Sequence, residues 1–306
     1  MQLIKSFTLL LVLGTSLLGK KVKPTFNDVS YGPHQDMTLN FWKIESKKPT
    51  PLLVHIHGGG WLGGKKNETA NTNELKKGYS FASIDYRLAG VELLPAAVHD
   101  AARSIQFLRT KAKEWNFDPN RIAVIGGSAG AASSLWLAYH DDMADLKSQD
   151  PVLRQSSRVC GAVAMGGQTT LNPFLLEKKI GLACIRHPMI WKTVGAQSHE
   201  HLMKNWDQYK DLSLECSPIT HVTSDDPPVF LNYGKPAPVP VIKGDGIHHA
   251  GFGRLLKEKC QVVGIPCYLQ VKDHEVPPVN KDDFFKKVFS IDKKITSNFL
   301  QKIEVF

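Results

Sequence analysis

The chain has 306 residues, 42% of them hydrophobic, which is enough to bury a substantial core in one large α/β domain or two small ones. Its formal net charge is +9, but the lysines are scattered in small clusters, and no basic run is interleaved with aromatic residues. This distribution argues against a nucleic-acid partner and favours a solvated basic surface. No internal repeat or low-complexity tract is visible, which argues against a repeat array or a long disordered segment.

The N-terminus has the layout of a secretory signal peptide. Lys5 precedes an apolar stretch over residues 7–18, small residues follow the apolar centre, and lysines begin after it. The stretch is too short for a comfortable membrane span. We therefore expect residues 1–19 to be a signal peptide and residues 24–306 to form a secreted or periplasmic domain with no stable membrane span after cleavage. A buried N-terminal segment and an uncleaved anchor are the alternatives.

The five cysteines do not form a metal-binding pattern. Their number is odd and no C-x-x-C pair occurs, so we expect neither a zinc site nor another bound metal. Cys184 with Cys216, or Cys260 with Cys267, could pair in an oxidising compartment. The sequence leaves that question open.

Short apolar runs alternate with longer helical patterns along the rest of the chain. The runs predict strands at residues 37–44, 52–56, 81–86, 121–125, 159–165, 229–233 and 268–271. Helical spacing predicts helices at residues 94–115, 130–139, 252–262 and 284–303, and a turn is expected at 118–120. Alternating strands and helices indicate an α/β fold with a doubly wound, mostly parallel sheet covered on both faces.

Residues 166–218 interrupt this alternation. The segment is mixed in character and contains two tryptophans and several histidines. We expect it to form a small cap inserted above the sheet.

The strongest motif is G-x-S-x-G at residues 126–130, placed between a predicted strand and a predicted helix. A sharp turn there presents the Ser128 hydroxyl above the carboxyl ends of the strands. It also points the helix N-terminus at the reacting group. The motif predicts Ser128 as a nucleophile; the alternative is an ordinary glycine-rich turn.

A second glycine motif, His57-Gly-Gly-Gly-Trp61, follows the strand at 52–56. Glycines let backbone amides approach a developing oxyanion closely, and one such donor contributes about 3–4 kcal/mol. We expect the amides of Gly59, Gly60 and Ala129 to form an oxyanion hole. A phosphate-binding loop is the weaker alternative, because neither G-K-[ST] nor G-x-G-x-x-G is present.

The motifs together resemble the hormone-sensitive-lipase-like branch of the α/β-hydrolases and the related secreted acetyl xylan and feruloyl esterases. The resemblance is carried by residues 57–61, 85–88, 94–97 and 126–130. It implies an eight-stranded doubly wound sheet, no cofactor, and ester hydrolysis through an acyl-enzyme. The substrate it implies is a small-molecule or polysaccharide ester, with acetyl or feruloyl groups on carbohydrate as candidates.

A serine nucleophile needs a general base, which in this fold follows the acid in the chain. His274 comes after the last predicted strand and is the expected base. His248 and His249 are the alternatives, although their position before the helix at 252–262 favours lining the pocket or capping that helix.

The acid is less clearly marked. The resemblance places it soon after the strand at 229–233, where this sequence has Ala237. Asp245, later in the same loop, is the expected replacement. Because Ala237 occupies the expected acid position, a second hypothesis is a catalytically weakened hydrolase homologue that binds a carbohydrate or ester ligand. Loss of the carboxylate from the serine-protease triad lowers kcat about 10⁴-fold.

Overall fold

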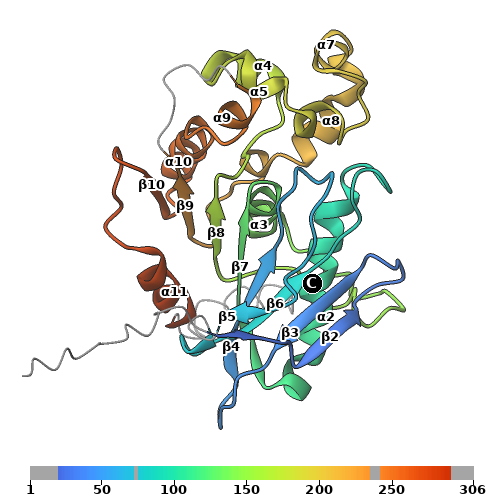
Figure 1. The fold of residues 1–306 in the computed structure, drawn as a ribbon, viewed down its shortest axis with the longest axis vertical. Helices are drawn as coiled ribbons and strands as arrows, with labels where there is room; N and C mark the ends of the chain where they lie inside the picture. Colours follow the sequence, from blue (N-terminus) through green and yellow to red (C-terminus); the bar gives the residue numbers. More distant parts are fainter. Residues whose placement is uncertain (1–19, 72–74, 235–241, 291–306) are drawn as a thin grey trace, which may run out of the picture.

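A computed structural model of the chain describes residues 20–71, 75–234 and 242–290. The predicted signal peptide and Ala237 lie outside these ranges. An eight-stranded sheet runs through the centre of the molecule (Figure 1) in the order β10-β9-β8-β7-β4-β6-β3-β2. Five neighbouring pairs are parallel, whereas β2–β3 and β3–β6 are antiparallel. This confirms the predicted α/β class with a mostly parallel sheet.

Seven strands of this sheet lie at the predicted apolar runs, whereas no apolar run predicts the outermost strand β2, whose sequence Phe-Asn-Asp-Val-Ser is largely exposed. The bounds of the strands are β2 Phe26–Ser30, β3 Thr38–Trp42, β4 Thr50–Ile56, β6 Ser80–Ile84, β7 Phe117–Gly127, β8 Ala162–Met165, β9 Val229–Tyr233 and β10 Cys267–Val271. A separate two-stranded ribbon joins β1 Lys21–Val22 to β5 Ala70–Asn71.

The turn expected at residues 118–120 forms inside β7 rather than before it. Thr50 of β4 pairs with Phe117, but Leu52 pairs with Ile122, so the residues between bulge out of the ladder. The Asp118 carboxylate accepts a hydrogen bond from the Asn120 amide at 2.9 Å, which closes the turn locally.

Helices cover both faces of the sheet and its upper edge. Those packed against the sheet are α2 Ala96–Trp115, α3 Ala129–Tyr139, α10 Gly251–Val263 and α11 Lys281–Ser290. Between β8 and β9 come α4 Pro173–Lys179, α5 Leu182–Ile185, α6 Pro188–Trp191, α7 His199–Lys204, α8 Trp206–Glu215 and the short η1 Pro218–Thr220, with α9 Lys243–Ile247 following β9. None of the helices within the described ranges is long and apolar enough to cross a membrane.

The core divides along the sheet because successive strand side chains point to opposite faces. Leu52 and Val54 of β4 face the larger apolar cluster, which includes residues of α2, α3 and α10. Leu53 faces a smaller cluster that is completed by Phe284 and other residues of α11. The helix predicted at residues 284–303 begins at Lys281 in the structure, and residues 291–303 lie outside the described ranges.

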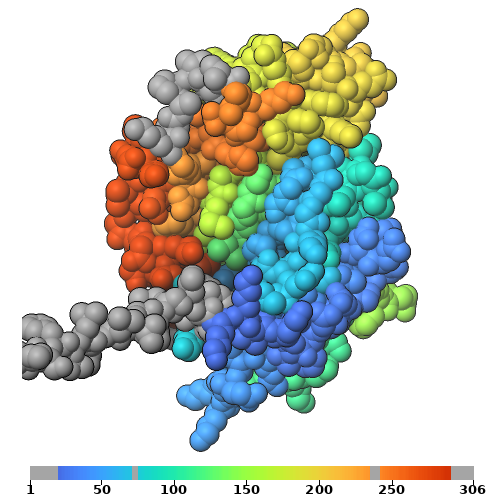
Figure 2. Space-filling model, viewed as in Figure 1, coloured from blue at the N-terminus to red at the C-terminus, as the bar shows by residue number. Residues whose placement is uncertain are grey.

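The helices between β8 and β9 stand above the carboxyl ends of the parallel strands (Figure 1). In the surface view (Figure 2), the orange α9 region lies directly against the yellow-green cap helices. The contact is close: a Cβ on Gly246 of α9 would lie 2.6 Å from the Cys184 amide nitrogen of α5. This edge of the sheet is where ligands bind in open α/β folds.

Candidate active site

Ser128 lies on a sharp turn between β7 and α3. Its φ of 54° and ψ of −123° are strained for a residue with a side chain. Gly126 and Gly130 permit the turn, because a Cβ on Gly126 would come within 2.3 Å of the Gly130 backbone, and one on Gly130 within 2.1 Å of the Ile56 carbonyl oxygen. The Ser128 amide donates to the Met165 carbonyl of β8 at 2.9 Å. The turn is therefore anchored to the sheet while the hydroxyl is left half-buried.

The imidazole beside Ser128 belongs to His248. Its Nε2 lies 2.9 Å from the Ser128 Oγ, and its Nδ1 lies 3.1 Å from the Gly244 carbonyl oxygen. A carbonyl can only accept, so Nδ1 carries the proton and donates it. Nε2 is then free to accept the hydrogen bond of the serine hydroxyl. This is the tautomer that a general base needs.

The structure does not bring His274 to Ser128. His274 is exposed in the turn after β10, and β10 is three strands away from β7 in the sheet, or roughly 14 Å at ordinary strand spacing. Glu275 holds this turn against α10, since its carboxylate contacts Arg254 at 2.8 Å and Lys257 at 3.4 Å. The imidazole that the structure places at Ser128 is therefore that of His248, one of the two alternatives, and not that of His274.

Asp245 lies in α9, three residues before His248, with its side chain exposed. Among the hydrogen bonds and ion pairs of the described residues, none joins its carboxylate to His248. The carbonyl of Gly244 occupies Nδ1 instead. Gly166, which follows β8, has a φ of +60°, and a Cβ there would lie 3.3 Å from Cδ2 of His248. The histidine ring thus rests on the bare backbone of Gly166.

The triple-glycine loop lies beside the serine. A Cβ on Gly58 would be 3.4 Å from the Cβ of Ser128. Within the described ranges, the amides of Gly59 and Gly60 have no intramolecular acceptor. Ala129 is the first residue of α3, so its amide is one of the unpaired donors of a helix N-terminus. The loop and the helix thus place free N–H groups near the hydroxyl.

The side chains that flank the loop hold it in place. The His57 ring donates to the Gly58 carbonyl at 2.8 Å and stacks on Tyr86 at 4.2 Å between ring centroids. The Tyr86 hydroxyl donates to the His57 carbonyl at 2.9 Å, and the buried Trp61 indole donates to Ser133 of α3 at 2.9 Å. Burial lowers the pKa of His57, although the Gly58 carbonyl and Asp85 partly offset this effect. His57 therefore supports the loop as a neutral side chain.

His187, just before α6, lies near the same loop and was not singled out by its sequence context. A Cβ on Gly60 would lie 3.9 Å from the His187 Cε1. Its Nδ1 accepts the Met189 amide at 3.3 Å, which leaves the ring proton on Nε2. Burial lowers the pKa of His187, and the neighbouring His248 and Lys243 lower it further. The cap thus contributes a neutral imidazole to the surroundings of the site.

The sheet order, the serine turn and the glycine loop together define an α/β-hydrolase. Residues 41–245 match the family described as BD-FAE. Since this match covers more than half of the chain, the chain belongs to the BD-FAE family, an esterase family with the α/β-hydrolase fold.

Curated relatives include the probable carboxylic ester hydrolase LipM of Mycobacterium tuberculosis, which is 26% identical over 222 residues that cover 68% of this chain and 47% of LipM. An arylesterase of Saccharolobus solfataricus is 39% identical over 109 residues, covering 33% of this chain and 35% of that protein. The chain therefore spans about half the length of LipM, and less of the arylesterase.

Solved structures show the same fold. A truncated carbohydrate esterase from gut microbiota superimposes with a TM-score of 0.68 at 18% identity, covering 89% of this chain and 97% of that one. An acetyl ester–xyloside bifunctional hydrolase from Caldicellulosiruptor lactoaceticus gives a TM-score of 0.59 at 22% identity, covering 95% and 98%. At 18–22% identity, these superpositions show that the chain shares the fold of the two enzymes.

Proposed function

We propose that the chain is a serine carboxylesterase that hydrolyses short acyl esters. The observation that carries the proposal is the contact of 2.9 Å between the Ser128 Oγ and the His248 Nε2 on a strained turn. A serine hydroxyl is a weak nucleophile unless an adjacent base accepts its proton. Membership of an esterase family supports the same reaction.

In the proposed mechanism, Ser128 attacks the acyl carbonyl while His248 accepts the hydroxyl proton at Nε2. The amides of Gly59, Gly60 and Ala129 stabilise the oxyanion of the tetrahedral intermediate. His248 then donates the proton to the leaving alcohol, and the acyl group stays on Ser128. A water molecule, deprotonated by His248, attacks this acyl-enzyme and releases the acid.

The orienting group of the histidine differs from an ordinary triad. The Gly244 carbonyl fixes the tautomer of His248, but it bears only a partial charge and stabilises an imidazolium less than a carboxylate does. Asp245, the acid expected from the sequence, lies one helical turn before His248 with an exposed side chain, but the Gly244 carbonyl is the group at Nδ1, so we propose that this carbonyl orients the base.

Acetyl or feruloyl groups on carbohydrate are the proposed substrates. The two structures with this fold described above are a carbohydrate esterase and an acetyl ester–xyloside hydrolase, which supports this choice. The proposal includes export by the expected signal at residues 1–19, which would place the enzyme near polysaccharides outside the cell.

A second candidate function follows from the same carbonyl contact. Without a carboxylate on Nδ1, the protein would bind an ester at Ser128 and turn it over slowly. In that case it would serve as a binding protein for acylated carbohydrate.

A fluorophosphonate probe and a series of 4-nitrophenyl esters distinguish the two functions. The esterase should be labelled once and release 4-nitrophenol fastest from the acetate. Both signals should disappear in Ser128→Ala and persist in the control Ser290→Ala, whose hydroxyl lies on the exposed face of α11. A wild-type protein that is neither labelled nor active, yet binds acetylated xylo-oligosaccharide in calorimetry, would establish the binding function instead.

A further inference from the structure

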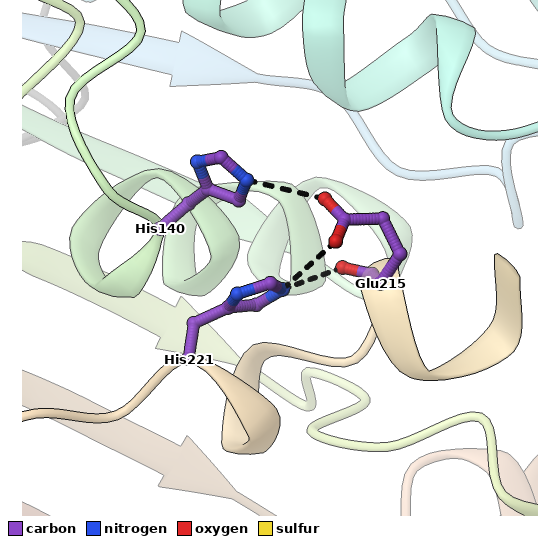
Figure 3. A group of neighbouring side chains, drawn as sticks. All are labelled: His140, Glu215 and His221. Atoms are coloured by element: carbon purple, nitrogen blue, oxygen red, sulfur yellow. Dashed lines mark hydrogen bonds and ion pairs between the residues drawn. The ribbon is translucent and has the colours of Figure 1, made fainter. Parts of the chain in front are cut away.

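Two histidines and a glutamate meet where the cap joins the sheet domain (Figure 3). His140 directly follows α3, Glu215 is the last residue of α8, and His221 directly follows η1. The three potential ligand atoms lie within 4.8 Å of one another. All three residues are partly buried, so the group is neither a solvated surface cluster nor part of the apolar core.

The distances suit a single ion held by several ligands. The His140 Nε2 lies 3.1 Å from the Glu215 Oε1, and the His221 Nε2 lies 4.0 Å from the Glu215 Oε2. Two ligands of one tetrahedral zinc ion stand roughly 3.3 Å apart, given metal–ligand bonds of about 2.0–2.1 Å. His140 and Glu215 already have this separation, whereas the His221 Nε2 would have to move closer to the carboxylate, from 4.0 Å.

The hydrogen bonds of His140 place a positive charge, either a proton or a metal ion, between its Nε2 and Glu215. Its Nδ1 lies 2.9 Å from the Asp141 carbonyl oxygen, so Nδ1 is the proton donor. The Nε2 lone pair then faces a carboxylate oxygen, and two lone pairs repel unless a positive charge lies between them. A ring nitrogen that donates to a backbone carbonyl is also the usual outer-shell arrangement of a metal-bound histidine.

We propose that His140, Glu215 and His221 bind a divalent transition-metal ion, with Zn²⁺ the best fit. Two imidazoles and one carboxylate are a common zinc set, whereas Ca²⁺ and Mg²⁺ prefer oxygen ligands alone. Water would complete the tetrahedron. In the structure the His221 Nε2 donates its proton to the Glu215 carbonyl at 2.6 Å, so binding the ion through Nε2 would move that proton to Nδ1. The carbonyl would keep the hydrogen bond that it accepts from the Trp136 indole at 2.9 Å.

The distance of the proposed metal site from Ser128 indicates a structural role for the ion. Ser128 precedes the first residue of α3 and His140 follows the last, and the helix of 11 residues spans about 16 Å. An ion at the far end is too distant to act on the ester. It would instead fasten the end of α8 to the end of the helix that carries the nucleophile.

Metal binding can be measured on the full chain after removal of metal with a chelator. Calorimetric titration with Zn²⁺ should show one ion bound per chain, and Zn²⁺ should raise the melting temperature because it binds the folded state. Cobalt(II) should give the intense visible absorption of a tetrahedral site. His140→Gln and His221→Gln should each weaken Zn²⁺ binding at least about tenfold.

A matched control is present in the chain. His199 and Glu200 also form a histidine–glutamate contact, at 3.0 Å, but the metal-binding group does not include them. His199→Gln should therefore leave Zn²⁺ affinity unchanged. The proposal is overturned if folded wild-type protein binds no Zn²⁺, or if the double variant His140→Gln/His221→Gln binds it as tightly as wild type. Either result would leave the group as a hydrogen-bonded contact only.

Discussion

The Nε2 of His248 lies 2.9 Å from the Oγ of Ser128 across 120 positions of the chain. This pair predicts unequal effects for two histidine substitutions. His248→Ala should lower kcat/KM for 4-nitrophenyl acetate about 10³- to 10⁴-fold, since it removes the proton acceptor of the nucleophile. His274→Ala should leave kcat/KM within about twofold, because that side chain is exposed after the outermost strand β10, three strands from β7. Steady-state kinetics of the two variants would reject the assignment if the larger loss fell on His274.

Asp245→Asn tests whether a carboxylate takes part. Because the Gly244 carbonyl already holds Nδ1 of His248, we expect kcat to fall less than about tenfold. A loss near 10⁴-fold would instead show that Asp245 reaches the imidazole during turnover. The pH dependence of kcat/KM in the same variant separates the two cases, since loss of a true triad acid would lower the pKa of the free-enzyme base.

Gly166→Ala should disturb catalysis from behind the histidine. The position has a φ of +60°, and the new methyl group would press on the His248 ring from 3.3 Å. We expect kcat to fall about 10- to 100-fold with a smaller change in KM, the effect of displacing one reacting group. Gly90→Ala is the control, since a Cβ there meets nothing within 4 Å. Equal kinetics for the two variants would contradict the packing described for His248.

His55 on β4 should make stability depend on pH. Burial lowers its pKa from 6.5 to about 4, with a smaller contribution from His57. Above pH 6.5 the imidazole is neutral in both states. As the pH falls from 6.5 to 4, His55 is protonated in the unfolded chain but stays neutral in the folded chain. The free energy of unfolding therefore declines by up to about 3 kcal/mol. Urea unfolding near neutral pH and near pH 4 should show a smaller difference for His55→Gln than for wild type. An unchanged difference would mean that His55 titrates normally.

Arg87 neutralises a buried carboxylate. Asp100 is 1% exposed and accepts hydrogen bonds from the Arg87 amide and Nε, both at 2.9 Å. Arg87→Met should cost about 3–5 kcal/mol, because it leaves Asp100 buried without its partner. Lys286→Met, which breaks an exposed pair with Asp283, should change stability little. If thermal unfolding shows similar losses for both variants, the Arg87 pair is solvated in solution.

The local features of the fold and site could be predicted from the sequence. The serine turn needs only a strand, G-x-S-x-G and a helix in succession, so Ser128 could be placed without knowing the rest of the fold. Seven strands of the sheet could be placed because each buried run is apolar over its length, whereas the outermost strand β2 is polar and largely exposed and gives no such signal. The bulge in β7 could not be predicted, because the sequence signals for a turn do not show whether the chain pairs with β4 again after the turn.

The partner of Ser128 could not be identified from the sequence in the same way. Two adjacent histidines, His248 and His249, occupy one loop, and only the packing of α9 decides which ring faces the serine. The turn at His274 is held against α10 by the ion pairs of Glu275 with Arg254 and Lys257, and no local sequence pattern predicts these pairs. The group at His140 could not be predicted either, because its members are separated by up to 81 positions and no spacing rule links them.

Because Gly246 of α9 packs closely against α5, Ser128 and His248 belong to different parts of the molecule. Ser128 is part of the sheet, whereas His248 ends a helix that is seated on the cap. Their separation therefore depends on how the cap rests on the strands below. Exchanging the cap to alter acyl preference would therefore also move His248, the proposed proton acceptor. A graft that keeps α5 and α9 together should preserve the alignment of His248 with Ser128.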